Sequence, residues 1–229
     1  MEQLVNGFSL HIPDGAFPLS TDSILLSDFV ALPRNARVID LGAGCGTLGV
    51  LLCARDGNCQ VTGIELSDEA HTAAQDNIVR NSLQSRMRSL QGDIRDLGQH
   101  ITAGSFDVCI SNPPYFSGGP TGTQHSTARH QDCCTTQQLC SAAAYALRYG
   151  GDFYLVHKPE YLAHICACAS KAGLEPKQLT LVRHRPQSEH NLILLKCRKG
   201  GKPGLQLSEL CLFHEDGTPT DYYKKLYRL

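Results

Sequence analysis

Arg37-Val-Ile-Asp-Leu-Gly-Ala-Gly-Cys-Gly46 joins a short β-rich run to three glycines at alternate positions, and an apolar stretch typical of a helix follows as far as Arg55. Glycine lets the main chain turn sharply out of a strand and leaves bare backbone for a ligand. Such a turn is common on its own, but here Glu65 ends the next strand-like run, where a carboxylate can accept both ribose hydroxyls of an adenosine. The stretch therefore predicts a nucleotide-binding βαβ unit.

A further acidic residue, after Asp40 and Glu65, helps to indicate which nucleotide binds. Asp93 and Ile94 follow a further predicted strand, so Asp93 can accept the adenine amino group while Ile94 packs on the ring. The glycines lack the GxGxxG spacing that seats a pyrophosphate, which argues against NAD. We therefore expect S-adenosylmethionine as the cofactor. The expected cofactor residues here are Asp40, Gly42, Gly44, Gly46, Glu65, Leu66, Asp93 and Ile94, together with Asn112 further along the chain.

The tetrapeptide Asn112-Pro113-Pro114-Tyr115 ends a predicted strand at 106–111 and borders the cofactor site. Its prolines stiffen the backbone, so the Pro113 carbonyl is a rigid acceptor beside the Asn112 side-chain oxygen. Two acceptors can hold the two hydrogens of a planar amino group and favour its pyramidalisation, which frees the lone pair for a methyl group. Tyr115 would stack on an extruded base. The alternative is a strand end that is merely stiff, and the upstream cofactor pattern argues against it.

The rest of the chain alternates strands with helices, which predicts right-handed βαβ crossovers. We expect an α/β fold with a doubly wound, seven-stranded, mostly parallel sheet of the Rossmann-like type. The last two strands lack a helix between them and should form an antiparallel hairpin at one edge. The expected strands are 37–41, 60–65, 88–91, 106–111, 152–157, 179–183 and 191–197, and the expected helices are about 47–55, 68–82, 139–148 and 160–172.

A single domain over residues 1–229 fits this length. We expect an N-terminal extension over the cofactor site (1–35), a core (36–200) and a C-terminal extension (201–229). Residues 116–134 carry glycine, serine, threonine and proline with almost no apolar periodicity, which predicts a substrate-facing loop.

Composition excludes several classes of protein. The eleven cysteines include no CxxC pair, so we expect reduced thiols and no metal site. No apolar run approaches 18 residues, and the N-terminus lacks the pattern of a secretory signal. We therefore expect a cytoplasmic protein with no membrane contact, and no obligate protein partner is evident.

The net charge of −1 hides an asymmetry. Residues 1–147 hold 8 Lys and Arg against 14 Asp and Glu, and residues 148–229 hold 13 against 8. A basic C-terminal third favours a phosphate-bearing partner, although charges scattered over a solvated surface would give the same count. The candidate RNA contacts are Arg129, His130, Arg183, Arg185 and Lys199. For Arg129 and His130 a salt bridge within the loop is an equal alternative.

On these motifs the chain resembles the amino-methyltransferases that carry an N-P-P-Y/F/W motif, and within them the bacterial tRNA1(Val) adenine N6-methyltransferase family. The resemblance covers nearly the whole chain, in the stretches 17–26, 112–116, 128–130, 155–160 and 205–227. It implies that the enzyme methylates N6 of the adenine beside the anticodon. It also places Thr21 and Asp22 near the methionine end of the cofactor. Relatives often have glycine where this chain has Ser23, and Thr21-Asp22 could equally cap a helix over 23–29.

Other substrates fit the same motif. A carboxamide is also a planar amino group, so glutamine N5-methylation of release factors is an alternative, although those enzymes carry a helical domain before the catalytic one and only about 35 residues precede the first strand here. DNA adenine methylation would usually need a target-recognition domain, for which this length leaves no room. Ribosomal RNA remains an alternative substrate. The other possibility is a non-enzymatic RNA-binding module with a vestigial nucleotide pocket. In such a module we would expect the glycines, Glu65, Asp93 or Asn112 to have been lost, and all of them are present.

Overall fold

The structure is a computed structural model that describes residues 2–13, 19–113 and 134–227. Its centre is an eight-stranded sheet in the order β10-β8-β9-β7-β6-β3-β4-β5, in which only β9 runs antiparallel to its neighbours. The strands are β3 (Arg37–Leu41), β4 (Gln60–Glu65), β5 (Met87–Gln91), β6 (Phe106–Ser111), β7 (Leu147–His157), β8 (Leu174–Arg183), β9 (His190–Lys199) and β10 (Gln206–Cys211). A separate two-stranded sheet pairs β1 (Glu2–Gln3) with β2 (Ser9–Leu10).

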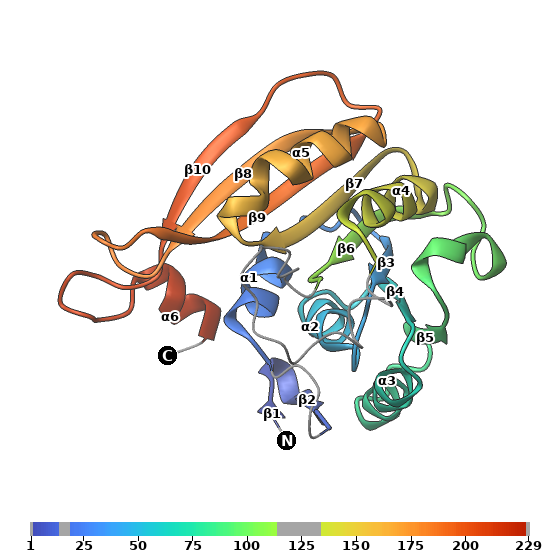
Figure 1. The fold of residues 1–229 in the computed structure, drawn as a ribbon. Coiled ribbons are helices and arrows are strands. Elements are labelled where there is room, and N and C mark those ends of the chain that lie inside the picture. The colour runs from blue at the N-terminus through green and yellow to red at the C-terminus, as the bar shows by residue number, and fades with distance from the viewer. Residues whose placement is uncertain (1, 14–18, 114–133, 228–229) are drawn as a thin grey trace, which may run out of the picture.

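Helices cover both faces of the large sheet (Figure 1). One buried apolar cluster packs the first face under α1 (Thr21–Phe29), α2 (Thr47–Arg55) and α3 (Asp68–Arg80). The other packs the second face under α4 (Thr136–Ala146) and α5 (Leu162–Lys171). The remaining helix α6 (Asp221–Tyr227) lies beside α1, and short 3-10 turns occupy Val5–Gly7 (η1), Ile94–Gln99 (η2) and Pro159–Tyr161 (η3). Each helical layer exists because an apolar stripe must be buried against the sheet.

The predicted fold class is confirmed, but the strand count is eight rather than seven. The antiparallel pair β8–β9 forms as expected, yet β10 adds parallel to β8, so the hairpin is not at the sheet edge. The side chains of β10 are mostly exposed, so its sequence carries no alternation of buried and exposed positions. Backbone pairing places this strand, and periodicity could not reveal it.

The N-terminal segment is attached to the core by two asparagines of α3 and its C-cap. The Oδ1 atoms of Asn77 and Asn81 accept hydrogen bonds of 2.8 Å from the backbone N–H groups of His11 and Ser9. The Nδ2 of buried Asn77 also donates to the Cys45 carbonyl at 3.0 Å. Asn77 therefore connects the N-terminal segment to the glycine loop.

The strand order reverses between β3 and β6. The chain leaves β3 toward β4 on one side, and returns to place β6 on the other side. Ligands of doubly wound sheets bind at such a switch point, outside the carboxyl ends of the strands. The glycine loop after β3 and Asn112 after β6 both lie at this point.

The structure also bears on membrane spans, metal ligands and cysteines. Within the described residues, no helix is both long and apolar enough to cross a membrane. In the same part of the chain, no three His, Cys, Asp or Glu side chains are grouped as metal ligands would be. The ten cysteines that the structure describes are all free thiols.

Candidate active site

The glycine loop has the conformation that its sequence predicts. Gly42, Gly44 and Gly46 have φ angles of 75°, 55° and 82°, values that side-chain-bearing residues rarely adopt. A Cβ atom built on Gly42 or Gly44 meets no atom of the described residues within 4 Å, so that part of the structure leaves the main chain there uncovered. Gly46 differs, because its Cβ would lie 2.9 Å from Met87 Cε. Gly42 and Gly44 thus leave room for a ligand, while Gly46 allows α2 to pack against β5.

Glu65 supports this loop from the end of β4. Its Oε2 accepts a hydrogen bond of 2.8 Å from the Gly44 backbone N–H, and its Oε1 accepts one of 2.8 Å from Ser67. Each carboxylate oxygen has a second lone pair, so the group can still accept ribose hydroxyls. Leu66 beside it is 48% exposed, as a residue lining an open ligand site would be.

Asp40 is the one acid of the predicted set that is almost completely buried, with 1% exposure. Neither carboxylate oxygen has a hydrogen-bond partner among the described residues. Burial, and then the charge of Glu65, raise the pKa of Asp40 to about 8. Asp40 lies in β3 just before the glycine loop, so this unsatisfied acceptor belongs to the region predicted to hold the cofactor.

Asp93 has a partner that the sequence did not reveal. Its carboxylate accepts the Arg95 backbone N–H at 2.8 Å and Nε of the Arg95 guanidinium at 2.8 and 2.9 Å. The hydrogen bonds from Arg95 hold the pKa of Asp93 below its ordinary value. A Cβ at Gly92 would lie 2.3 Å from His100 Nε2, so a side chain there would require the His100 ring to move. Ile94 is half-buried in the first turn of η2.

Asn112 follows β6 directly and is fixed from two sides. Its Nδ2 donates a hydrogen bond of 3.0 Å to Ser23 Oγ of α1. The preceding Ser111 hydroxyl donates to the Leu41 carbonyl at 2.8 Å, which ties the end of β6 to the end of β3. Pro113 is half-buried beside Asn112. The other two motif residues, Pro114 and Tyr115, lie outside the described residues.

The helix α1 brings Thr21 and Asp22 to the same region as Asn112. It begins at Thr21 rather than at residue 23, and its N-cap is Ser20, whose Oγ accepts the Ser23 backbone N–H at 3.3 Å. The alternative in which Thr21-Asp22 caps the helix is therefore wrong. The Thr21 side chain instead contacts the C-terminal helix, because Tyr227 Oη lies 3.1 Å from Thr21 Oγ1. Sequence patterns gave no sign of this contact, which joins residues 206 positions apart.

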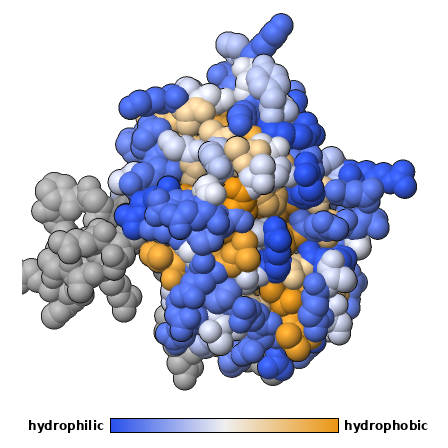
Figure 2. Space-filling model, turned by 90° about the vertical axis from the view of Figure 1, so that its right-hand side faces the viewer, coloured by the Kyte–Doolittle hydropathy of each residue, from blue (hydrophilic) through white to orange (hydrophobic). Residues whose placement is uncertain are grey.

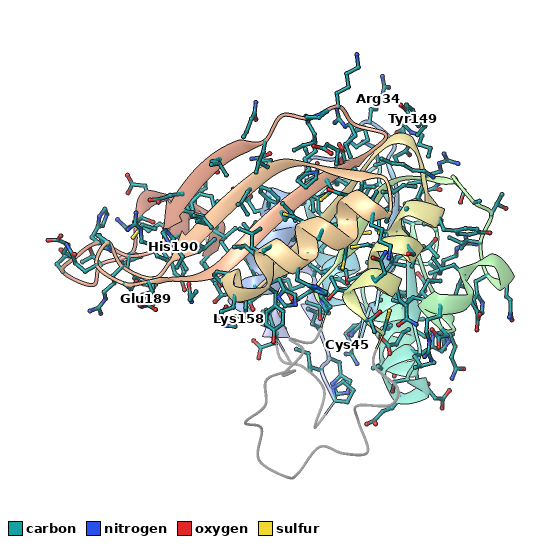
Figure 3. All side chains as sticks on the ribbon, turned by 45° about the horizontal axis from the view of Figure 1, so that its top comes forward. Arg34, Cys45, Tyr149, Lys158, Glu189 and His190 are labelled. Atoms are coloured by element: carbon teal, nitrogen blue, oxygen red, sulfur yellow. The ribbon has the colours of Figure 1, made fainter. Side chains whose placement is uncertain are left out.

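The predicted RNA contacts lie at opposite ends of the strands. We call the side where the parallel strands end the carboxyl edge, and the side where they begin the opposite edge. Arg183 ends β8 at the edge where β7 ends, and Arg185 follows it. Arg183 forms an ion pair with Glu209, and Arg185 is exposed. Lys199 instead ends β9, beside the start of β7, where its Nζ donates to the Leu147 carbonyl at 2.7 Å. Figure 3 shows the two edges, with Cys45 and Lys158 at one and Arg34 and Tyr149 at the other. Arg129 and His130 lie outside the described residues.

A doubly wound sheet with a glycine loop at its switch point is the architecture of the class I methyltransferases. Residues 19–165 match the Methyltransferase small domain family. The tRNA1(Val) (adenine(37)-N6)-methyltransferase of Shewanella sp. (strain MR-4) is 31% identical, with 94% of this chain and 97% of that protein covered. The protein of that name from Photobacterium profundum is 27% identical, with 97% and 100% covered.

Solved structures agree on the fold. A protein described as a predicted O-methyltransferase from Agrobacterium tumefaciens has a TM-score of 0.76 at 24% identity, covering 91% of this chain and 96% of that one. A methyltransferase from Pyrococcus furiosus has a TM-score of 0.63 at 23% identity, covering 86% and 91%. The chain therefore belongs to the methyltransferase small domain family, and its relatives over the full length carry the tRNA1(Val) name. The predicted enzyme class is confirmed.

Proposed function

We propose that this enzyme transfers a methyl group from S-adenosylmethionine to N6 of an adenine in tRNA. The observation that carries the proposal is the position of Asn112, which follows β6 at the switch point, across from the open glycine loop after β3. The tRNA1(Val) name and the adenine 37 target of the full-length relatives make that nucleotide the first candidate. An enzyme acting on tRNA would work in the cytoplasm.

The residues present fit the cofactor. Gly42 and Gly44 leave the space in which a ligand can lie against the main chain, and Glu65 ends the neighbouring strand. Asp40, whose buried carboxyl oxygens lack a partner among the described residues, could hydrogen-bond the methionine end of the cofactor, where the resemblance also places Thr21 and Asp22. Asp93 keeps its charge beside Arg95 and can accept the adenine amino group. When bound, the cofactor supplies an electrophilic methyl group on a sulfonium.

The target amino group needs acceptors rather than a strong base. Its lone pair is delocalised into the adenine ring, so it is a weak nucleophile. The Asn112 Oδ1 and the Pro113 carbonyl would each accept one of its hydrogens and favour the pyramidal form. Such fixed dipoles stabilise the developing positive charge on nitrogen and cost no reorganisation during the reaction. Tyr115 would stack on the flipped base.

The tRNA would approach the carboxyl edge of the sheet, where the glycine loop, Asn112, Arg183 and Arg185 are found. The segment 116–134 continues directly from the motif and remains our candidate for a substrate-facing loop. Lys199 lies at the other edge, so we no longer include it among the contacts near the target nucleotide.

Methyl transfer to individual tRNA transcripts tests this proposal. Unmodified transcripts are incubated with labelled S-adenosylmethionine, digested to nucleosides and separated by chromatography. We expect N6-methyladenosine from the tRNA1(Val) transcript and none when guanine replaces adenine 37. Transfer to ribosomal RNA alone, or to a glutamine in a release factor, would replace the proposal with one of its rivals. Cofactor binding without methyl transfer to any substrate would favour the non-enzymatic RNA-binding module.

A further inference from the structure

The amide of Asn112 is asymmetric, and its usefulness depends on which end faces the substrate. The oxygen Oδ1 can accept a hydrogen bond from an amino group, whereas Nδ2 can only donate. An amide turned by 180° would present N–H groups to the N–H groups of the target. Some contact on the protein side must therefore set the orientation of this side chain.

Ser23 makes that contact. Its Oγ lies 3.0 Å from Asn112 Nδ2, and Ser23 is only 6% exposed, so little water can compete for its hydroxyl. The contact joins α1 to the end of β6, 89 positions apart in the sequence. With Nδ2 held by Ser23, Oδ1 is on the other arm of the same planar group and does not face the Ser23 hydroxyl.

The hydroxyl of Ser23 has a second neighbour in the helix N-cap. Ser20 Oγ lies 3.4 Å from Ser23 Oγ, a contact in which either hydroxyl can donate, and Ser20 Oγ accepts the Ser23 backbone N–H at 3.3 Å. When Ser23 donates to Ser20, its lone pairs stay available to Asn112. In that arrangement donation runs from Asn112 to Ser23 and from Ser23 to Ser20.

We propose that Ser23 is a positioning residue for methyl transfer, which fixes the Asn112 amide with Oδ1 toward the target amino group. The proposal rests on the proposed function of Asn112 and adds a residue that does not touch the substrate. It separates Ser23 from its neighbours Thr21 and Asp22, which we place at the cofactor. Loss of the Ser23 hydroxyl should therefore affect turnover and leave cofactor affinity alone.

The test compares Ser23→Ala with Ser27→Ala. Ser27 is on the same helix and is also buried, at 8% exposure, but its hydroxyl donates to the Ile24 carbonyl at 2.8 Å. We expect Ser23→Ala to lower kcat about three- to tenfold, the value of one neutral hydrogen bond, with KM for tRNA and Kd for S-adenosylmethionine near wild type. Ser27→Ala should leave all three constants near wild type. A fall in cofactor affinity with unchanged kcat, or equal effects of the two variants, would overturn the proposal.

A spectroscopic measurement decides the point without relying on activity. In NMR spectra of ¹⁵N-labelled protein, the side-chain amide signals of Asn112 are assigned as those that disappear in Asn112→Ala. We expect slow exchange of these amide protons with water in the wild type and in Ser27→Ala, and fast exchange in Ser23→Ala. Fast exchange in the wild type would refute the hydrogen bond to Ser23. The two proposals can fail separately. If the wild type methylates no tRNA but its Asn112 amide protons exchange slowly, the proposed function is wrong, while the orientation of Asn112 by Ser23 is still supported.

Discussion

At the scale of single residues, Asn112 and Tyr115 have different proposed roles that kinetics can separate. Asn112 would stabilise the amino group most strongly as it becomes pyramidal, which is an effect on the transition state. We expect Asn112→Ala to lower kcat by roughly two to three orders of magnitude, comparable to the loss of one preorganised group in an oxyanion site. Cofactor affinity, measured by calorimetry, should stay nearly intact. A near wild-type rate in a folded variant would refute the amino-methyltransferase mechanism.

Tyr115 provides the contrast, because stacking needs its ring and not its hydroxyl. Tyr115→Phe should stay active, while Tyr115→Ala should lose about 1–3 kcal/mol of stacking free energy. Both are measured as kcat/KM for tRNA in variants that bind the cofactor. Equal impairment of the two variants would assign the hydroxyl a role that stacking does not explain.

Glu65 has one observed role and one proposed role. It hydrogen-bonds the glycine loop, and we propose that it also accepts the ribose hydroxyls of the cofactor. The structure shows its carboxylate accepting from the Gly44 and Ser67 backbone N–H groups. We expect Glu65→Ala to weaken S-adenosylmethionine binding by about 1.5–3 kcal/mol, the range for a hydrogen bond to a charged group. Asp68→Ala removes an exposed acid three positions further along and should leave affinity unchanged in the same calorimetric titration. Wild-type affinity in folded Glu65→Ala would remove Glu65 from the site.

Asp40 should make the stability of the cofactor-free enzyme depend on pH. Its pKa is about 8 in the folded protein against an ordinary value of 3.8, so between these values the folded state keeps a proton that the unfolded chain releases. The free energy of unfolding then falls as pH rises through this window, by up to about 1.4 kcal/mol per pH unit. Asp40→Asn removes that contribution. In urea titrations at pH 5 to 8, Asp40→Asn should gain stability relative to the wild type as pH rises. A difference that does not change with pH would show that Asp40 is not protonated in the folded protein.

At the scale of helices and strands, the sequence predicts those elements that are marked by a buried apolar run and a clear turn. The strands 37–41, 60–65 and 106–111 lie at the predicted positions, because each is a buried apolar run beside a clear turn. Strands β7 and β9 extend beyond their predicted ends, to Leu147–His157 and His190–Lys199. The polar ends of β9 still pair with β8, and β7 pairs with β6 as early as Leu147. Contacts such as Asn112–Ser23 could not be predicted, because they join distant segments through single polar side chains.

The contact between α6 and α1 is another feature that no pattern revealed, and its strength can be measured. Tyr222 Oη donates a hydrogen bond of 2.8 Å to Asp28 Oδ2, and burial raises the pKa of this phenol above its ordinary value. We expect Tyr222→Phe to lower the free energy of unfolding by about 1.5–3 kcal/mol, because the acceptor is a carboxylate. Tyr149→Phe is the control, since Tyr149 is 77% exposed and its hydroxyl donates to the Gly200 carbonyl at 3.1 Å. Equal urea midpoints for the two variants would contradict a stabilising role for the α6–α1 contact.

At the scale of the whole molecule, the basic residues of the C-terminal third do not all lie near the target site, although they are close together in the sequence. Asp152 pairs with Lys196 and Arg198, and Arg148 pairs with Asp107 near the start of β7. These three basic side chains lie away from the carboxyl edge, so they add nothing to the positive charge near the target nucleotide. Figure 2 views the β5 side, where hydrophilic residues cover most of the surface and apolar areas are small and separate. Any electrostatic attraction of RNA near the target therefore depends on a few residues at the carboxyl edge.

Salt dependence of tRNA binding tests which edge meets the RNA. Each phosphate contact that is lost lowers the slope of log K against log salt by about one. Arg185 is exposed at the carboxyl edge and Lys199 lies at the other, so Arg185→Glu and Lys199→Glu change the net charge equally but at different places. We expect Arg185→Glu to weaken binding of the tRNA1(Val) transcript at low salt and to flatten the slope, while Lys199→Glu leaves both near wild type. Because a nonspecific attraction depends on net charge alone, it would give equal changes in the two variants. A larger effect of Lys199→Glu would place the RNA across the opposite edge and would separate its binding surface from Asn112.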